Sequence, residues 1–121
     1  MNNRILVVDD DVTSLDIVDV MLESQGFDVV RASNGKAAVE GVEEADPDLI
    51  LIDLMMPHMS GQEAVRQIRS KGIECPIVAF TALDDPSVHQ DAKDAGCNIV
   101  VTKPCKTKDL VRGIQELLNK A

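Results

Sequence analysis

The strongest constraint on the fold of this chain is an alternation of short apolar runs with longer amphipathic segments. The runs have the length of β-strands and read RILVV, DVV, DLILI, PIVAF and NIVV in chain order. After the first run, Leu15, Val18 and Leu22 recur at three- and four-residue spacing, which is typical of one face of a helix. Strand and helix signals that alternate in this way favour a parallel sheet.

Two of the runs, at 49–52 and 77–80, are apolar at every position, so both faces of these strands should be buried. Helices on both sides of a parallel sheet meet this requirement. We therefore predict an α/β fold of the doubly wound type, a three-layer sandwich built from five strand–helix units. Residues suited to cap a helix stand before four of the helical segments: Ser33 or Asn34, Ser60, Asp84 or Asp85, and Thr107.

Length, charge and cysteine content narrow the class of protein. With 121 residues and 45% hydrophobic content, residues 1–121 can bury a core as one domain. A formal net charge of -9 opposes binding to nucleic acid. The three cysteines are odd in number and lack metal-ligand spacing, so we expect reduced thiols. Because no apolar run is long enough for a signal peptide or a bilayer span, we expect a cytoplasmic protein that binds no membrane.

Polar residues follow four of the apolar runs. Asp9 and Asp10 follow the first run, Asp53 the third, Thr81 the fourth and Lys103 the fifth. The carboxyl ends of parallel strands meet at one edge of a sheet, so these side chains should converge in one crevice. Crowded carboxylates repel one another unless a cation balances them, and Mg²⁺ binds carboxylate oxygens together with phosphate. We therefore predict a magnesium site with Asp10 and Asp53 as ligands and Asp9 acting through water.

The same edge of the sheet suits phosphoryl transfer. A carboxylate can attack phosphorus to form an acyl phosphate, and Asp53 is the candidate because it stands alone at the end of its strand. Lys103 would place a positive charge near one phosphoryl oxygen, and Thr81 would donate a hydrogen bond to another. His58 and His89 are expected to be solvated surface residues with no part in this chemistry.

As an ordered set, VVDD, LILIDLMMPHMSG, FTA and TKP resemble the receiver domain of response regulators in two-component signalling, the CheY-like family. The resemblance spans essentially the whole chain and implies a flavodoxin-like fold with strand order 2-1-3-4-5. It implies that Asp53 is the phosphoacceptor and that Asp9 and Asp10 form the acidic pair. The backbone carbonyl of Met55 would be a further magnesium ligand.

The resemblance also implies a mode of action. The phosphoryl group would come from a phosphohistidine on a sensor histidine kinase or a histidine phosphotransfer protein. Thr81 would be the switch hydroxyl and Lys103 the lysine of the site. The phosphorylated domain would present a changed surface to a downstream protein, which the sequence does not identify. The chain would catalyse only its own phosphorylation and dephosphorylation, as a monomer or weak homodimer. We expect no attached output domain, because the last helix reaches Ala121, and a cis bond before Pro104.

Three positions depart from the family pattern. Val100 stands where an aromatic residue usually couples to the threonine, Cys105 replaces the phenylalanine usual after Lys-Pro, and Ser60 stands where an acidic residue is common. Any aromatic toggle is therefore missing. Met55 and Leu83 would flank the phosphoryl group with apolar side chains that cannot orient an attacking water, so we expect slow autodephosphorylation.

Three other functions share parts of this pattern. The first is a receiver-like interaction module that acts without phosphorylation, and Val100 in place of the usual aromatic residue is the feature that favours it. The second is a magnesium-dependent phosphatase of the haloacid-dehalogenase type, which also uses an aspartate nucleophile. Such enzymes place the nucleophile in an early DxD motif and enclose the substrate with a cap segment, and no cap segment is evident in this short chain. A flavodoxin-like flavin carrier would need a phosphate-cradling loop after the first strand, where this chain has DDDVTS, and aromatic residues, which make up 2% of it.

Overall fold

Strands and helices alternate along the chain, as the spacing of apolar residues predicts. The computed structural model describes residues 2–120, apart from the side chain of Lys120. The elements in chain order are β1 (Arg4–Val8), α1 (Val12–Glu23), β2 (Asp28–Ala32), α2 (Gly35–Ala45), β3 (Leu49–Ile52), α3 (Gly61–Ser70), β4 (Ile77–Thr81), α4 (Pro86–Ala95), β5 (Ile99–Thr102) and α5 (Thr107–Lys120).

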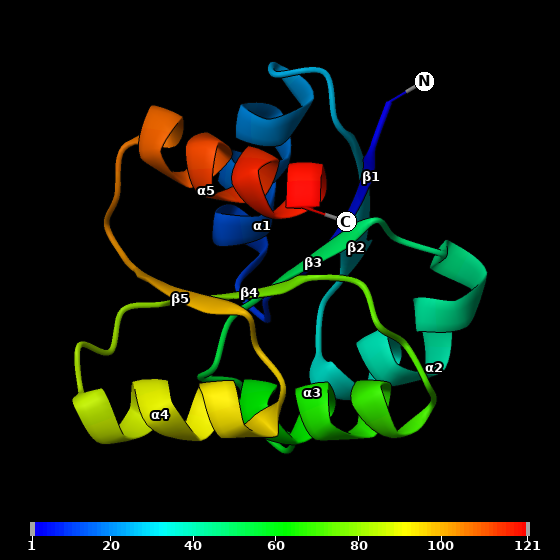
Figure 1. Cartoon of the computed structure of the whole chain (residues 1–121), viewed down its shortest axis with the longest axis vertical. Helices are drawn as coiled ribbons and strands as arrows, with labels where there is room; N and C mark the ends of the chain where they lie inside the picture. The colour runs from blue at the N-terminus through cyan, green and yellow to red at the C-terminus, as the bar shows by residue number, and fades with distance from the viewer. Residues whose placement is uncertain (1, 121) are drawn as a thin grey trace.

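The strands form one parallel sheet in the order β2-β1-β3-β4-β5, which confirms the predicted doubly wound, flavodoxin-like fold (Figure 1). Val8 at the end of β1 is paired with Ile52 at the end of β3. Thr81 at the end of β4 is paired with Thr102 at the end of β5. Because of this register, the residues that follow these four strands lie along one edge of the sheet.

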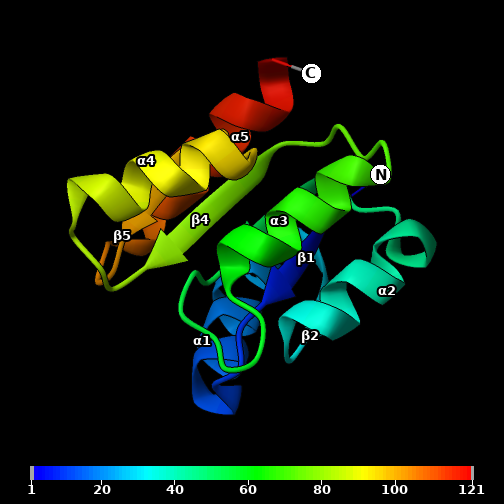
Figure 2. The ribbon, with the colours of Figure 1, turned by 90° about the horizontal axis from the view of Figure 1, so that it is seen from below.

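Helices cover both faces of the sheet, with α1 and α5 on one face and α2, α3 and α4 on the other (Figure 1, Figure 2). β3 contributes to the core on each side. Leu49 and Leu51 pack in the core beneath α1 and α5, whereas Ile50 and Ile52 pack in the core beneath the other three helices. Burying each such side chain stabilises the fold by about 1.5–3 kcal/mol. A strand with two buried faces must be apolar throughout, as the LILI run predicted.

Side-chain caps begin four of the helices. Asn34, Ser60 and Asp85 accept hydrogen bonds from backbone N–H groups in the first turns of α2, α3 and α4, as predicted. Asp11 caps α1 in the same way. The cap predicted at Thr107 is wrong by one position, because α5 begins with Thr107 itself.

The peptide bond before Pro104, the cysteines and the length of the helices also agree with the sequence. The peptide bond between Lys103 and Pro104 is cis, as expected. Cys75, Cys97 and Cys105 are free thiols, and Cys97 is buried. Across residues 2–120, none of the helices combines the length and the apolar character needed to cross a bilayer.

Candidate functional site

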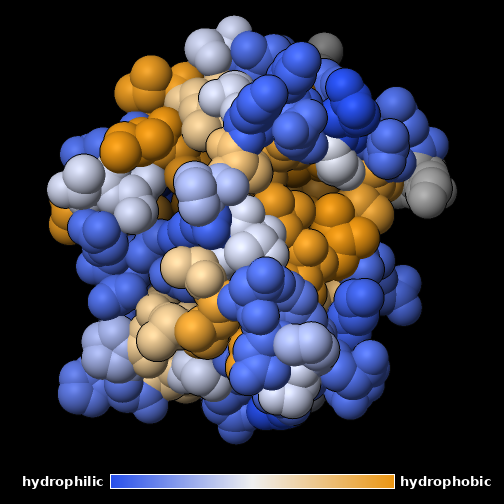
Figure 3. Space-filling view, turned by 90° about the vertical axis from the view of Figure 1, so that its left-hand side faces the viewer, coloured by the Kyte–Doolittle hydropathy of each residue, from blue (hydrophilic) through white to orange (hydrophobic). Residues whose placement is uncertain are grey.

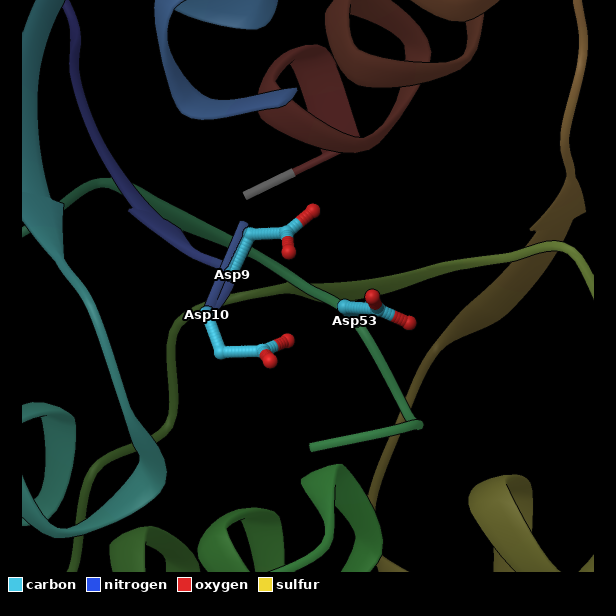
Figure 4. A group of neighbouring side chains, drawn as sticks. All are labelled: Asp9, Asp10 and Asp53. Carbon is cyan, nitrogen blue, oxygen red and sulfur yellow. The ribbon is translucent and has the colours of Figure 1, made fainter. Parts of the chain in front are cut away.

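Three carboxylates meet at the carboxyl edge of the sheet (Figure 4). Asp9 and Asp10 follow β1, and Asp53 follows the neighbouring strand β3. Each contributes one oxygen, and these oxygens lie within 4.8 Å of one another. The Asp53 N–H donates to the Val8 carbonyl over 3.0 Å, which extends the pairing of β1 with β3 to the acidic residues. Asp9 is buried, Asp53 is half-buried and Asp10 is exposed, so the cluster opens to solvent on one side.

Lys103 brings a positive charge into this cluster from the far end of the chain. Its Nζ donates a hydrogen bond of 3.2 Å to Asp9 Oδ2 and lies 3.7 Å from Asp53 Oδ2. The same ammonium group lies 5.1 Å from the centroid of the Phe80 ring. The lysine side chain is only 23% exposed, so water screens these contacts less than at an open surface. One lysine balances only part of the charge of three carboxylates.

The pKa of Asp53 is raised above the ordinary aspartate value, chiefly because burial removes water from the carboxylate. The Met55 N–H, which donates to Asp53 Oδ1 over 3.1 Å, and the Lys103 ammonium both lower this pKa. The charges of Asp9 and Asp10 raise it further. The cluster therefore carries uncompensated negative charge, and an added cation would favour the ionised form of Asp53.

A close approach of two backbone segments shapes the loop that follows Asp53. The loop returns to the end of β3 at Gly61, whose N–H donates to the Leu54 carbonyl over 3.0 Å. A Cβ at position 61 would lie 2.3 Å from the Asp53 carbonyl oxygen and 2.7 Å from Leu54 Cα. A Cβ at this position would force one of the two segments to move, so glycine allows α3 to begin directly against the candidate nucleophile.

Thr81 lies at the same edge of the sheet, with its hydroxyl engaged by the loop between β4 and α4. Thr81 Oγ1 accepts a hydrogen bond of 3.2 Å from the Leu83 N–H, and the Leu83 carbonyl accepts one of 2.7 Å from His89 Nε2. His89 is partly buried and bound to the Leu83 carbonyl, so the expectation of a solvated surface residue holds only in part. Leu83 thus links the completely buried Thr81 to the first turns of α4.

The structure brings four of the sequence-predicted site residues together, although their roles stay predictions: Asp9, Asp10, Asp53 and Lys103. Thr81 shares the edge of the sheet, but its hydroxyl contacts Leu83. Sequence reasoning missed Phe80, the aromatic neighbour of Lys103. The available signal was that Phe80 directly precedes Thr81 on the strand next to β5. This position does not indicate that the ring lies beside Lys103.

The donor set of this cluster fits a hard divalent cation. Its ligand atoms are carboxylate oxygens, which Mg²⁺ prefers, and among the described residues the cluster contains neither histidine nor cysteine. The exposure of Asp10 leaves space for an ion that retains part of its water shell. Asp9, Asp10 and Asp53 would hold such an ion, and the part assigned to the Met55 carbonyl stays a prediction.

The sequence of this chain is similar to those of known proteins. The family model of the response regulator receiver domain matches residues 5–115. The alkaline phosphatase synthesis transcriptional regulatory protein PhoP of Bacillus subtilis (strain 168) is 32% identical over 121 residues, which are 100% of this chain and 50% of that protein. The chain therefore spans about half the length of this relative.

Solved structures show the same fold. The receiver domain of the sensor histidine kinase PA1611 from Pseudomonas aeruginosa PAO1, with a magnesium ion coordinated in its active site cleft, is 31% identical, has a TM-score of 0.90 and covers 98% of this chain and 99% of that one. A CheY-like response regulator receiver domain protein from Methanospirillum hungatei JF-1 is 27% identical, has a TM-score of 0.93 and covers 99% of this chain and 96% of that one. Sequence match, strand order and acidic edge agree, and this chain belongs to the family of response regulator receiver domains.

Proposed function

We propose that the chain accepts a phosphoryl group on Asp53 from a phosphohistidine of a sensor histidine kinase or a histidine phosphotransfer protein, and that the reaction requires Mg²⁺. The observation that carries this proposal is the meeting of Asp53, two further carboxylates and Lys103, with Lys103 Nζ 3.7 Å from Asp53 Oδ2. Family membership supports the proposal, because receiver domains are signalling modules. The same proposal includes a cytoplasmic location. It also holds that the chain catalyses only its own phosphorylation and dephosphorylation.

In the proposed reaction, an Asp53 oxygen attacks phosphorus, the bond between phosphorus and the donor's imidazole nitrogen breaks, and an acyl phosphate forms. The imidazole keeps the electron pair of the broken bond and takes a proton from water. The Lys103 ammonium, already beside Asp53, can move onto a phosphoryl oxygen. When bound by Asp9, Asp10 and Asp53, Mg²⁺ supplies positive charge that reduces repulsion between the carboxylate and the phosphoryl oxygens.

The signal would leave the site through the loop between β4 and α4. A phosphoryl group on Asp53 would draw the Thr81 hydroxyl toward it and break the contact with the Leu83 N–H. Because the Leu83 carbonyl is bound to His89, the change reaches α4 without an aromatic side chain on β5. Val100, which stands in place of that aromatic residue, packs against the core beneath α2, α3 and α4. The surface of α4 and its preceding loop is therefore the one proposed to change.

The surface beside the site suits the docking of a protein donor. Val12, Ile17 and Val20 on α1 are apolar, yet each is between 58% and 69% exposed. Next to them, an apolar groove of about 280 Å³ lies between α1 and the loop after β5 and reaches Lys103. Figure 3 shows the side of the molecule that carries the loops after β4 and β5, where apolar side chains gather in separate patches among polar ones. A donor must bring its phosphohistidine to Asp53, so its docking surface must border the site, as this face does.

The test of the proposed function is intact mass spectrometry after incubation with acetyl phosphate, with and without Mg²⁺. We expect one phosphoryl adduct on the wild type with Mg²⁺, much less without it, and none on Asp53→Asn. Asp28→Asn is the matched control, because Asp28 is an exposed carboxylate at the start of β2, on the opposite edge of the sheet.

Two outcomes would contradict the proposal. A folded wild type that gains no adduct would favour the interaction module that acts without phosphorylation. Continuous and rapid release of phosphate from small phosphomonoesters, without a stable adduct on Asp53, would instead favour the phosphatase.

A further inference from the structure

The Phe80 ring lies against the ammonium group that the proposed reaction needs. Lys103 Nζ is 5.1 Å from the ring centroid. The same ammonium contacts Asp9 and Asp53 at 3.2 and 3.7 Å. The face of an aromatic ring carries partial negative charge and attracts a cation, most strongly where water is partly excluded. Lys103 is thus held by two carboxylates and one aromatic ring.

Phe80 is itself fixed by its surroundings. It is 8% exposed and belongs to the core beneath α1 and α5. In the β4–β5 register it is paired with Val101, and it directly precedes Thr81. A ring anchored in a strand and packed in a core keeps its place, whereas a lysine side chain has four flexible carbon–carbon bonds. The ring therefore offers a fixed surface to a mobile charge.

We propose that Phe80 is a positioning residue for Lys103, and that its ring keeps the ammonium over the acidic cluster until a phosphoryl group reaches Asp53. This inference rests on the proposed phosphoacceptor function. Lys103 and Phe80 both line the open groove beside Pro104 and Cys105, so an unrestrained ammonium on this long side chain can turn toward solvent. The attraction of the ring reduces the time that Nζ spends away from the reacting atoms.

Two substitutions separate the ring from its apolar bulk. Phe80→Leu removes the aromatic face and keeps an apolar side chain, whereas Phe80→Tyr keeps the face. Phe80 is among the residues that line the groove. With acetyl phosphate and Mg²⁺ as the probe, we expect Phe80→Leu to lower the initial rate of adduct formation about two- to tenfold, and Phe80→Tyr to remain near the wild-type rate. Rates are compared at a temperature at which thermal unfolding shows each variant to be folded.

A double-mutant cycle distinguishes positioning from a general structural effect. In a Lys103→Ala background the ring has no ammonium to position, so Phe80→Leu should change the rate little. Equal slowing in the wild-type and Lys103→Ala backgrounds would overturn the inference.

Proton NMR gives a readout that does not depend on phosphorylation. The ring current should shift the ε-methylene protons of Lys103 upfield in the wild type and in Phe80→Tyr, and this shift should disappear in Phe80→Leu. The same chemical shifts in all three proteins would show that the ring and the ammonium are not in contact. A wild type that shows the upfield shift but forms no adduct would overturn the proposed function, and the positioning role with it, while leaving the contact in place.

Discussion

Substitution of Gly61 by alanine should destabilise the protein and disturb its acidic site together. The added Cβ would lie 2.3 Å from the Asp53 carbonyl oxygen and 2.7 Å from Leu54 Cα, and both are backbone atoms that no side-chain rotation can move. Ordinary carbon–oxygen contacts are about 1 Å longer than the first distance, so the start of α3 must move away from β3.

The size of the effect follows from the cost of overpacking. Forced backbone shifts of this kind cost roughly 1–3 kcal/mol. With an unfolding entropy of about 2.1 cal/mol/K per residue, a loss of about 2 kcal/mol lowers the Tm of a domain of this length by about 8 °C. The shift begins at the backbone of Asp53, so Mg²⁺ should also stabilise Gly61→Ala less than it stabilises the wild type.

Thermal unfolding followed by circular dichroism, with and without Mg²⁺, measures both effects. Gly41→Ala is the matched control, because Gly41 lies inside α2 and an added Cβ there meets nothing within 4 Å. Alanine in a helix interior is more stable than glycine by about 0.5–1 kcal/mol, so Gly41→Ala should raise the Tm. A Tm for Gly61→Ala equal to or above that of the wild type would refute the steric argument.

Four further predictions concern the chemistry of the site and its link to α4. Met55→Asn combined with Leu83→Glu should shorten the half-life of the Asp53 adduct after acetyl phosphate is removed, as followed by intact mass; an equal or longer half-life would contradict the expected slow autodephosphorylation. Because burial raises the pKa of Asp53, the folded state holds this proton to higher pH than the unfolded chain, and stability falls as pH rises through the raised pKa. Asp53→Asn should therefore have a higher Tm than the wild type at neutral pH in a chelator, and a lower Tm would argue against the assigned cause. Mg²⁺ at about one hundred times its dissociation constant should add about 2.7 kcal/mol to the free energy of unfolding of the wild type, and equal stabilisation of Asp53→Asn would exclude that carboxylate as a ligand. His89→Ala should speed hydrogen exchange at the Leu83 amide and leave the amides of β1 unchanged, whereas unchanged exchange at Leu83 would show that His89 does not hold the loop.

Most of the fold could be predicted because its signals are local. The LILI run is apolar at each position because β3 is covered on both faces. Asn34 and Ser60 were recognised as caps because a cap accepts from an N–H three residues later in the chain. Thr107 was misplaced by one residue, because α5 begins with Thr107 itself and the Lys106 carbonyl already accepts a hydrogen bond from the Leu110 N–H.

The candidate site could be predicted in part for a related reason. In a parallel sheet, the position of a residue at the end of a strand determines the edge at which it lies, so Asp9, Asp53 and Lys103 could be placed together before any contact was known. Their distances could not be predicted, nor could the binding of Leu83 to His89, because that contact depends on the path of a loop.

The sequence by itself determined which segments form strands and helices, which faces they bury, and which polar groups end the strands, because these properties depend on residue spacing along the chain. Only the tertiary structure decided that Lys103 binds Asp9, 94 positions away, and lies over the Phe80 ring. It also decided that a side chain at position 61 would collide with the backbone of Asp53 and Leu54. These features depend on the packing of segments distant in sequence, and a local pattern of residues carries no information about the distance between such segments.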